Sequence, residues 1–472
     1  MIGNLRAAIR CWYERGPMNE EIQQTTKDAT VLPHHARYLW SFGFMNAVCF
    51  TIALGSPMVL CARYLNAGES LIGFLLALTP LFTILQLPAA RYADRLGYQK
   101  LMRAGWRTRA FMVLAMVPLP LLVHVLPGNF LLFLFALFSV LFNAVRGFAS
   151  GSWNPWIKQL IAPSLLGKYF SIESIIANIA ALLTLVASSF ILGRNPTGWQ
   201  YSVLLAISGI AGIVSVVPLA KAPEGALPRL VENPEPVWTI VKNVWAISDF
   251  RRLLRFSMVN AFALGGTQGF TVLFLKEIVG IGEGRVVMLT TAGLFGAMIG
   301  AFFLGQYLDR TGSKPVMRVA GWGHIIFFSF LVLFSGIGPH ADFILLAVVL
   351  ALGGMFNNAN GVATGRLILN ACPREELTIA MALAQTGGAL SMGISTVAWG
   401  FILEWLRAPE WFGHDSRWPF FAFYSVVLVL IVVCQFLLNH VRETAALPTD
   451  RFVRALLLDW PQKMWDDLRG RD

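Results

Sequence analysis

Charge is scarce in this sequence. Only 13% of the 472 residues are charged and 56% are hydrophobic, which is too apolar for the surface of a water-soluble protein. Acidic residues are the scarcer kind, with 26 against 37 lysines and arginines, so the net charge is +11. The shortage of charge excludes a string of soluble domains and predicts that lipid surrounds most of the chain.

Cysteine is rare as well, and none of the five cysteines belongs to a CxxC pair. The histidines do not cluster at the spacing of metal ligands. The apolar segments also lack a Ser/His pair or paired carboxylates at a spacing useful for catalysis. We therefore expect no cofactor, no metal and no enzymatic activity.

What the sequence does contain is twelve apolar runs of roughly 16 to 27 residues, near the length that a helix needs to cross a membrane. The runs do not alternate in polarity, which argues against barrel strands and leaves helices to satisfy the backbone inside lipid. They cover residues 42–60, 71–89, 110–126, 130–145, 170–192, 201–220, 256–275, 286–304, 319–337, 343–363, 379–403 and 418–438. The sequence predicts an all-α membrane protein with twelve transmembrane helices.

Basic residues indicate the orientation of these helices. The first forty residues are polar, which argues against a cleaved signal peptide and places the N-terminus in the cytoplasm. About 30 of the 37 lysines and arginines then fall on cytoplasmic segments, as the positive-inside rule requires. One short loop holds Arg91, Arg95, Lys100, Arg103, Arg107 and Arg109. We expect a multi-pass inner-membrane protein with both termini in the cytoplasm, whose positive charge faces anionic lipid and not nucleic acid.

An internal repeat divides the chain into two halves. Segments 68–69, 90–97, 102–106 and 142–151 return in order as 282–283, 305–312, 318–322 and 356–365. Four matches at one offset of about 214 to 216 residues indicate a tandem duplication. Because six helices return a chain to the same side of the membrane, we expect two parallel repeats about an axis along the membrane normal.

The expected organisation has five parts. A cytoplasmic tail (1–38) precedes the first six-helix bundle (39–220), and the second bundle (256–440) precedes a second cytoplasmic tail (441–472). The intervening segment 221–255 is rich in proline at its start and then amphipathic, which predicts a cytoplasmic linker with an interfacial helix. This linker is compatible both with a simple tether and with a role in gating.

Two copies of one loop motif resemble the signature of the major facilitator superfamily. The matching residues are Asp94, Arg95, Gly97 and Lys100 in the first copy, and Asp309, Arg310, Gly312 and Lys314 in the second. The resemblance implies a secondary transporter built as two pseudo-symmetric six-helix bundles. It also implies that these loops latch the cytoplasmic side while the transporter is open outward, through ion pairs that form in one conformation and break in another. The alternative is that these charges only enforce topology.

Polar residues inside the apolar runs are candidates for solute binding, because a central arginine costs about 2.5–3.5 kcal/mol on insertion scales. Arg146 lies one helical turn from Asn143, so both side chains can share one face. Arg146 could bind an anionic group of the solute, neutralise Glu173 on the next helix, or reach the interface. Glu173 is also the candidate for ion coupling. Further cavity candidates are Asn46, Asn260, Gln268, Asn357 and Asn360.

Small residues in the same two helices predict close helix packing. Gly147 and Gly151 stand at GxxxG spacing, as do Gly361 and Gly365 in the second half. This spacing lets two helix backbones approach each other in a membrane.

Taken together, these features predict transport of a small polar or anionic solute by a monomer that alternates its access between the two sides. The solute would move by exchange or by symport with an ion that the sequence does not reveal. A drug/proton exporter is one alternative, although such exporters often place an acid in the cavity. The resemblance implies that the first, fourth, seventh and tenth helices line the cavity, and their apolar runs contain no acid. A non-transporting membrane sensor on the same fold is the other.

Overall fold

The structure is a computed structural model of the whole chain. It describes residues 31–86, 89, 96–225, 242, 245–337, 342–371, 377–413, 415–441 and 443, without the side chains of 302–311, 369–371 and 377–379. All regular secondary structure in these residues is helical. Most of the two predicted tails and about half of the predicted linker therefore lie outside the described residues, and residues 248–255 at the end of that linker are already part of the helix that follows it.

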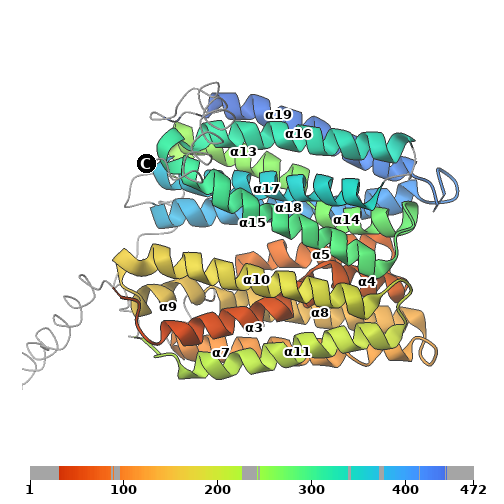
Figure 1. Ribbon diagram of the computed structural model, residues 1–472, viewed down its shortest axis with the longest axis horizontal. Coiled ribbons are helices and arrows are strands. Elements are labelled where there is room, and N and C mark those ends of the chain that lie inside the picture. The colour runs from red at the N-terminus through yellow and green to blue at the C-terminus, as the bar shows by residue number, and fades with distance from the viewer. Residues whose placement is uncertain are drawn as a thin grey trace, which may run out of the picture.

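The first half, residues 31–225, contains six helical rods (Figure 1). In chain order its elements are α3 (Ala36–Leu54), α4 (Ser56–Tyr64), α5 (Glu69–Leu81), η1 (Phe82–Leu85), α7 (Tyr98–Met116), η2 (Leu119–Leu122), α8 (Gly128–Ser150), α9 (Trp153–Leu160), η3 (Pro163–Leu165), α10 (Leu166–Leu192) and α11 (Gly198–Lys221). Two of the rods are composite, because α4 continues α3 and η1 continues α5.

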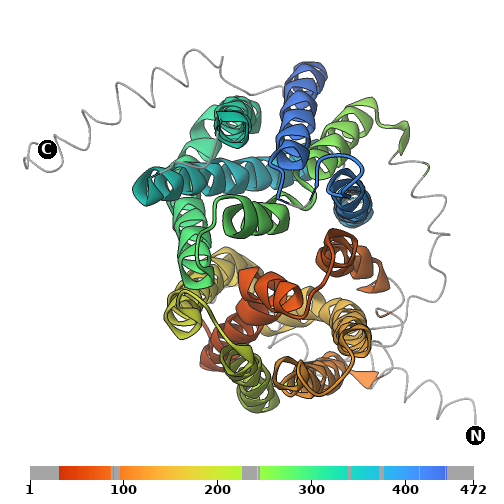
Figure 2. The same ribbon diagram turned by 90° about the vertical axis from the view of Figure 1, so that its right-hand side faces the viewer.

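The second half, residues 245–443, repeats this arrangement. Its elements are α13 (Ser248–Leu264), α14 (Thr267–Leu273), the π-helix η4 (Phe274–Ile278), α15 (Glu283–Thr311), α16 (Ser313–Ile337), α17 (Phe343–Ala371), α18 (Leu377–Leu406) and α19 (Trp418–His440). Figure 2 looks along the rods and shows the two halves as separate bundles, red to yellow-green below and green to blue above.

Ten of the helical stretches in the described residues are long and apolar enough to cross a membrane. The rod formed by α5 and η1 is shorter but apolar, and α7 completes the set of twelve. The predicted all-α fold of twelve transmembrane helices in two bundles is confirmed.

The third rod differs from its prediction. We expected it to begin at residue 110, but α7 begins at Tyr98, directly after Gly97 turns the chain with a positive φ of 86°. Arg103, Arg107 and Arg109 therefore lie on the helix and not in a loop. The charged residues hid this part of the helix because the apolar run starts only where the charges stop.

The two ends of the molecule are distinct. We call the end with the connections at 65–68, 193–197, 279–282 and 407–417 the distal end, and the opposite end, where α3 begins and α19 finishes, the proximal end. Contacts between the halves pair α5 with α18 and α10 with α15, and the short helices α4 and α14 also meet. In Figure 1 the ribbons of the two halves converge towards the right, which is the distal end.

Breaks in the first and seventh rods shape this distal contact. The first rod breaks at Gly55, just before Pro57 in the first turn of α4. The seventh breaks at Gly265 and Gly266, and Gly266 has a φ of +73° that a side chain would strain. The breaks let the distal segments α4 and α14 run in directions different from α3 and α13.

The prediction of close glycine packing is half right. Gly147 and Gly151 face the backbone of the second rod, and a Cβ at Gly151 would lie 3.0 Å from the carbonyl oxygen of Gln86. A Cβ at Gly361 or Gly365 would meet nothing within 4 Å, so the prediction is wrong for the second half. The spacing alone does not reveal whether a partner helix covers that face.

Candidate functional site

Four charged residues join the two halves at the distal end. We call Arg63, Glu69, Glu277 and Arg407 the distal ion-pair cluster. Nη1 of Arg407 lies 2.6 Å from Oε1 of Glu69 in the first half and 2.6 Å from Oε2 of Glu277 in its own half. Arg63 pairs with Glu277 across the interface and, at 3.3 Å, with Glu69. Charges of opposite sign therefore alternate around the cluster.

The cluster is buried and carries no net charge. The side chains of Arg407 and Glu69 are only 2% and 4% exposed, and those of Glu277 and Arg63 are 12% and 14% exposed. Buried ion pairs contribute little net stability, but removal of one partner leaves an uncompensated charge that costs about 3–5 kcal/mol. Separation of the halves at this end would break the pairs Arg407–Glu69 and Arg63–Glu277 and leave each arginine with the carboxylate of its own half.

The repeat contained a signal for this contact that we did not use. Arg63 and Glu277 are 214 residues apart, the offset of the repeat, so they occupy equivalent positions with opposite charges. Equivalent residues close to a pseudo-two-fold axis face each other. The apolar runs predicted from the sequence instead leave Arg63 and Arg407 in two separate connections, 61–70 and 404–417.

Two further contacts close the distal end beside the cluster. The backbone amide of Ser70 donates to Oε2 of Glu404 at 2.7 Å, across the interface between α5 and α18. One turn further along, a Cβ on Gly73 would lie 2.9 Å from Cα of Gly400. The absence of side chains at both positions allows the two backbones to cross closely.

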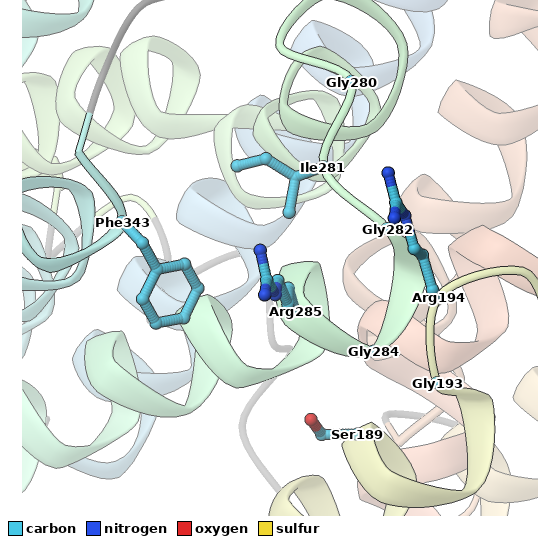
Figure 3. Close-up of a pocket in the computed structure, with 9 residues that line it drawn as sticks. All are labelled: Ser189, Gly193, Arg194, Gly280, Ile281, Gly282, Gly284, Arg285 and Phe343. Atoms are coloured by element: carbon cyan, nitrogen blue, oxygen red, sulfur yellow. The ribbon is translucent and has the colours of Figure 1, made fainter.

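A cavity of about 570 Å³ lies at the distal end between α10 and the start of α15. Figure 3 shows Arg194 from the first half and Arg285 from the second half beside three glycines of the connection before α15 and at its start. Both arginines are exposed. The amide of Gly284 donates to the carbonyl of Gly193 at 2.7 Å, so this cavity is another place where the halves touch.

Two arginines lie inside the first half. Arg109 on α7 is 0% exposed, and its Nη2 donates to Oδ1 of Asn46 on α3. The same oxygen accepts from Nε1 of Trp106 at 2.9 Å. On α8, Nη2 of Arg146 donates to the carbonyl of Thr79 at 2.7 Å. Neither guanidinium forms an ion pair with an acidic side chain among the described residues.

Comparison with known proteins supports the architecture. The profile of the Major Facilitator Superfamily matches residues 39–337 and 254–470. The chain belongs to this superfamily. The comparison with curated proteins gave no match.

Several solved facilitator structures share the fold of this chain at low sequence identity. A mutant of the nucleoside transporter NupG has a TM-score of 0.68 at 13% identity, over 87% of this chain and 100% of that one. The D-xylose-proton symporter has a TM-score of 0.65 at 15% sequence identity, over 88% of this chain and 98% of that one. A bacterial homologue of the iron transporter ferroportin, in its inward-facing state, has a TM-score of 0.64 at 14% sequence identity, over 87% of this chain and 99% of that one.

In this facilitator, the structure brings together some of the predicted cavity residues of the first half. Asn143 is 2% exposed and receives a hydrogen bond of 3.0 Å from Thr79, the residue whose carbonyl accepts from Arg146. Arg146 and Glu173 do not form an ion pair. Glu173 instead lies against Gly43 of α3. The sequence analysis missed Arg109, which belongs to this group.

The cavity candidates of the second half are less closely connected. Asn360 is buried at 5% exposure, whereas Asn357 and Gln268 are exposed, and Asn260 is half-buried. Nothing in the described part of the chain joins these four side chains by hydrogen bonds, so they stay predicted sites.

The motif loops of the superfamily show the same backbone turn in both halves. Gly97 and Gly312 have positive φ values of 86° and 88°, immediately before α7 and α16. Nζ of Lys100 lies 3.4 Å from Oε1 of Glu224, and Nζ of Lys314 donates a hydrogen bond of 2.6 Å to the carbonyl oxygen of Val441. Both lysines thus contact the end of the sixth rod in their own half.

The remaining motif residues are not placed. Asp94 and Arg95 lie outside the described residues. The backbones of Asp309 and Arg310 belong to α15, but their side chains are not described. Their latch role stays a prediction.

Proposed function

We propose that this chain is a secondary transporter of the inner membrane that moves a small polar or anionic solute by alternating access, and that the distal ion-pair cluster is its outer gate. The cross-interface pairs Arg407 with Glu69 and Arg63 with Glu277 carry this proposal. Four buried charges that pair with one another both across the interface and within each half are suited to a contact that forms and breaks as the halves approach and separate.

The orientation of the gate follows from the charge distribution. The loops at the proximal end and the two tails carry most lysines and arginines, so the proximal end is assigned to the cytoplasm with both termini. The distal end then faces outward, and the structure represents the inward-facing state. A solved relative in the inward-facing state shares the fold, which is consistent with this assignment.

The other end of the cycle is assigned to the motif loops. In the outward-open state, Asp94, Arg95, Asp309 and Arg310 would latch the proximal end, with Lys100 and Lys314 beside them. Glu173 is the proposed coupling group for symport, and the transporter acts as a monomer. Solved relatives that carry nucleosides, xylose with protons, and metal share the fold, so the fold leaves the solute open.

A reversible crosslink tests the alternating gate. In a chain with its five native cysteines replaced by serine, Ser70→Cys and Glu404→Cys would be joined across the distal interface. We expect the disulfide to abolish counterflow of the transported solute in proteoliposomes and a reductant to restore it. A matched pair within the first half, Val117→Cys and Ser202→Cys, should leave counterflow unchanged.

One result of the crosslinking experiment would contradict the proposed gate. If the crosslinked chain transports as fast as the reduced chain, the distal end does not need to open, and the proposed cycle is wrong.

A further inference from the structure

Among the described residues, two cations inside the first half, Arg109 and Arg146, have no acidic partner. Arg109 is completely buried, and its Cζ lies 5.6 Å from the ring centroid of Phe142, which stands one helical turn before Arg146 on the same face of α8. The acceptors that hold these two guanidinium groups are neutral, namely the amide oxygen of Asn46 and the backbone carbonyl of Thr79. A buried charge without a counter-ion is costly, and a second charge of the same sign adds to that cost.

Several donors of the two guanidinium groups are unused. Nε and Nη1 of Arg109 and Nε of Arg146 are buried, and the described residues offer them no hydrogen-bond partner. Buried polar atoms in proteins nearly always have a partner, so unpaired donors on two neighbouring cations indicate a missing acceptor with negative charge.

Aromatic rings fix the orientation of Arg109. Its Cζ lies 4.3 Å from the ring centroid of Phe50, 4.5 Å from that of Trp106 and 5.6 Å from that of Phe142. Cation–π contacts of this kind stabilise a desolvated guanidinium but accept no hydrogen bonds. The rings therefore hold the group in place without satisfying its donors.

Arg109 lies well inside the third rod and away from its proximal end. It stands 11 residues after Tyr98, the first residue of α7, which corresponds to about 16 Å of helix. An anion at that depth is better explained as bound cargo than as a counter-ion from bulk water or a lipid headgroup.

We propose that Arg109 and Arg146 together bind an oxyanion group, a carboxylate or a phosphoryl group, of the transported solute. The proposal rests on the proposed transport function and narrows it from polar or anionic solutes to oxyanions. A guanidinium presents parallel N–H donors that match two oxygens of one oxyanion, which a halide or a neutral hydroxyl does not provide.

Ligand-dependent thermal stability of the full-length protein in nanodiscs tests this site, since a ligand that binds the folded state raises the apparent Tm. The probes are inorganic phosphate and succinate at matched ionic strength, with glucose as the neutral control. We expect phosphate or succinate to raise the Tm, and the one that acts identifies the phosphoryl or the carboxylate class. Glucose should have no effect.

Variants assign the effect to the two arginines. Arg109→Gln and Arg146→Gln should each lower the affinity for the active anion at least tenfold. Arg107→Gln is the matched control, because Arg107 is an exposed arginine on the same helix and its loss should leave the affinity unchanged. If Arg109→Gln does not fold, Arg109→Lys retains the charge without the planar fork and should still lower the affinity.

The opposite results overturn the assignment. In the first, neither anion raises the Tm of the wild-type protein. In the second, the Arg109 and Arg146 variants bind the active anion as tightly as the control Arg107→Gln does. Counterflow separates this failure from that of the transport function. A protein that exchanges a neutral sugar and ignores both anions remains a transporter without this oxyanion site. Anion binding through the two arginines in a protein that transports nothing would instead overturn the transport function.

Discussion

Nη1 of Arg407 lies 2.6 Å from Oε1 of Glu69, although the two residues are 338 positions apart in the sequence. Both side chains are almost completely buried, at the boundary between the two halves of the duplication. Because the pair connects the halves only at the distal end, its interaction energy stabilises the state in which the distal end is closed over the state in which it is open. Four predictions follow from this arrangement and from the packing around it.

Substitution of Arg407 by Gln should shift the protein towards opening of the distal end. Loss of this cation removes the positive charge that pairs with both Glu69 and Glu277, which changes the free energy of the closed end by about 3–5 kcal/mol. Double electron–electron resonance between spin labels on the exposed residues Asn195 and Glu410 should report a longer distance population. The same distances in the variant and the wild type would contradict a gating role for this residue.

The control for that experiment is Arg285→Gln. Arg285 also lies at the distal end of the second half, but it is exposed and lines the distal cavity. Its removal should leave the label distances unchanged, which separates the effect of the ion pairs from that of charge at this surface.

A side chain at Gly73 should open the distal end by steric means. In the closed state its Cβ would lie 2.9 Å from Cα of Gly400, and a backbone atom cannot move aside as a flexible side chain does. We expect Gly73→Val to lengthen the Asn195–Glu410 label distance without removing any charge. Gly361→Val, at a helical glycine with open space around it, should not change this distance.

Gly147 should tolerate no larger residue, because its α-carbon faces the carbonyl group of Phe82. Gly147→Ala is expected to destabilise the fold by about 1–3 kcal/mol through overpacking. Gly361→Ala should be neutral or stabilise by up to about 1 kcal/mol, since alanine favours a helix and nothing crowds the site. Equal Tm values for the two variants in thermal unfolding would show that the close approach at Gly147 is absent.

Asn46→Asp should place a counter-ion beside Arg109, which has no acidic partner in the part of the chain that the structure describes. A carboxylate in place of the Asn46 amide would still accept from Arg109 and Trp106, now with negative charge. We expect a higher Tm without added anion and at least a tenfold weaker response to the active anion, because the new carboxylate competes with it. Asn260→Asp, at the equivalent position of the second half, should leave the anion response unchanged. An undiminished response in Asn46→Asp would contradict the competition.

Much of the fold could be predicted from the sequence because lipid imposes a simple rule. Each rod needs about 20 apolar residues, and the rods with few charges were found close to their observed positions. The rule failed at α7, where Arg103, Arg107 and Arg109 interrupt the apolar run. Two of these arginines are exposed and one is buried, a difference that composition does not encode.

The candidate site was harder to predict because its residues meet through packing. Arg146 was a candidate site residue from its place at the end of an apolar run, with Glu173 as one of three alternative roles, but it donates to the carbonyl of Thr79 and forms no ion pair with Glu173. Arg109 was assigned to a loop, and the distal ion-pair cluster was divided among separate loops. Only the position of the helices relative to one another shows which charges are paired.

By itself, the sequence determined that the chain forms twelve membrane helices, and that it does so in two related halves. Apolar length and the repeat offset are local or periodic properties, so they can be read along the chain. The tertiary structure decided which end is closed and which charges have partners. These depend on contacts between residues hundreds of positions apart, such as Arg407 with Glu69, whose energy exists only after the halves have packed together.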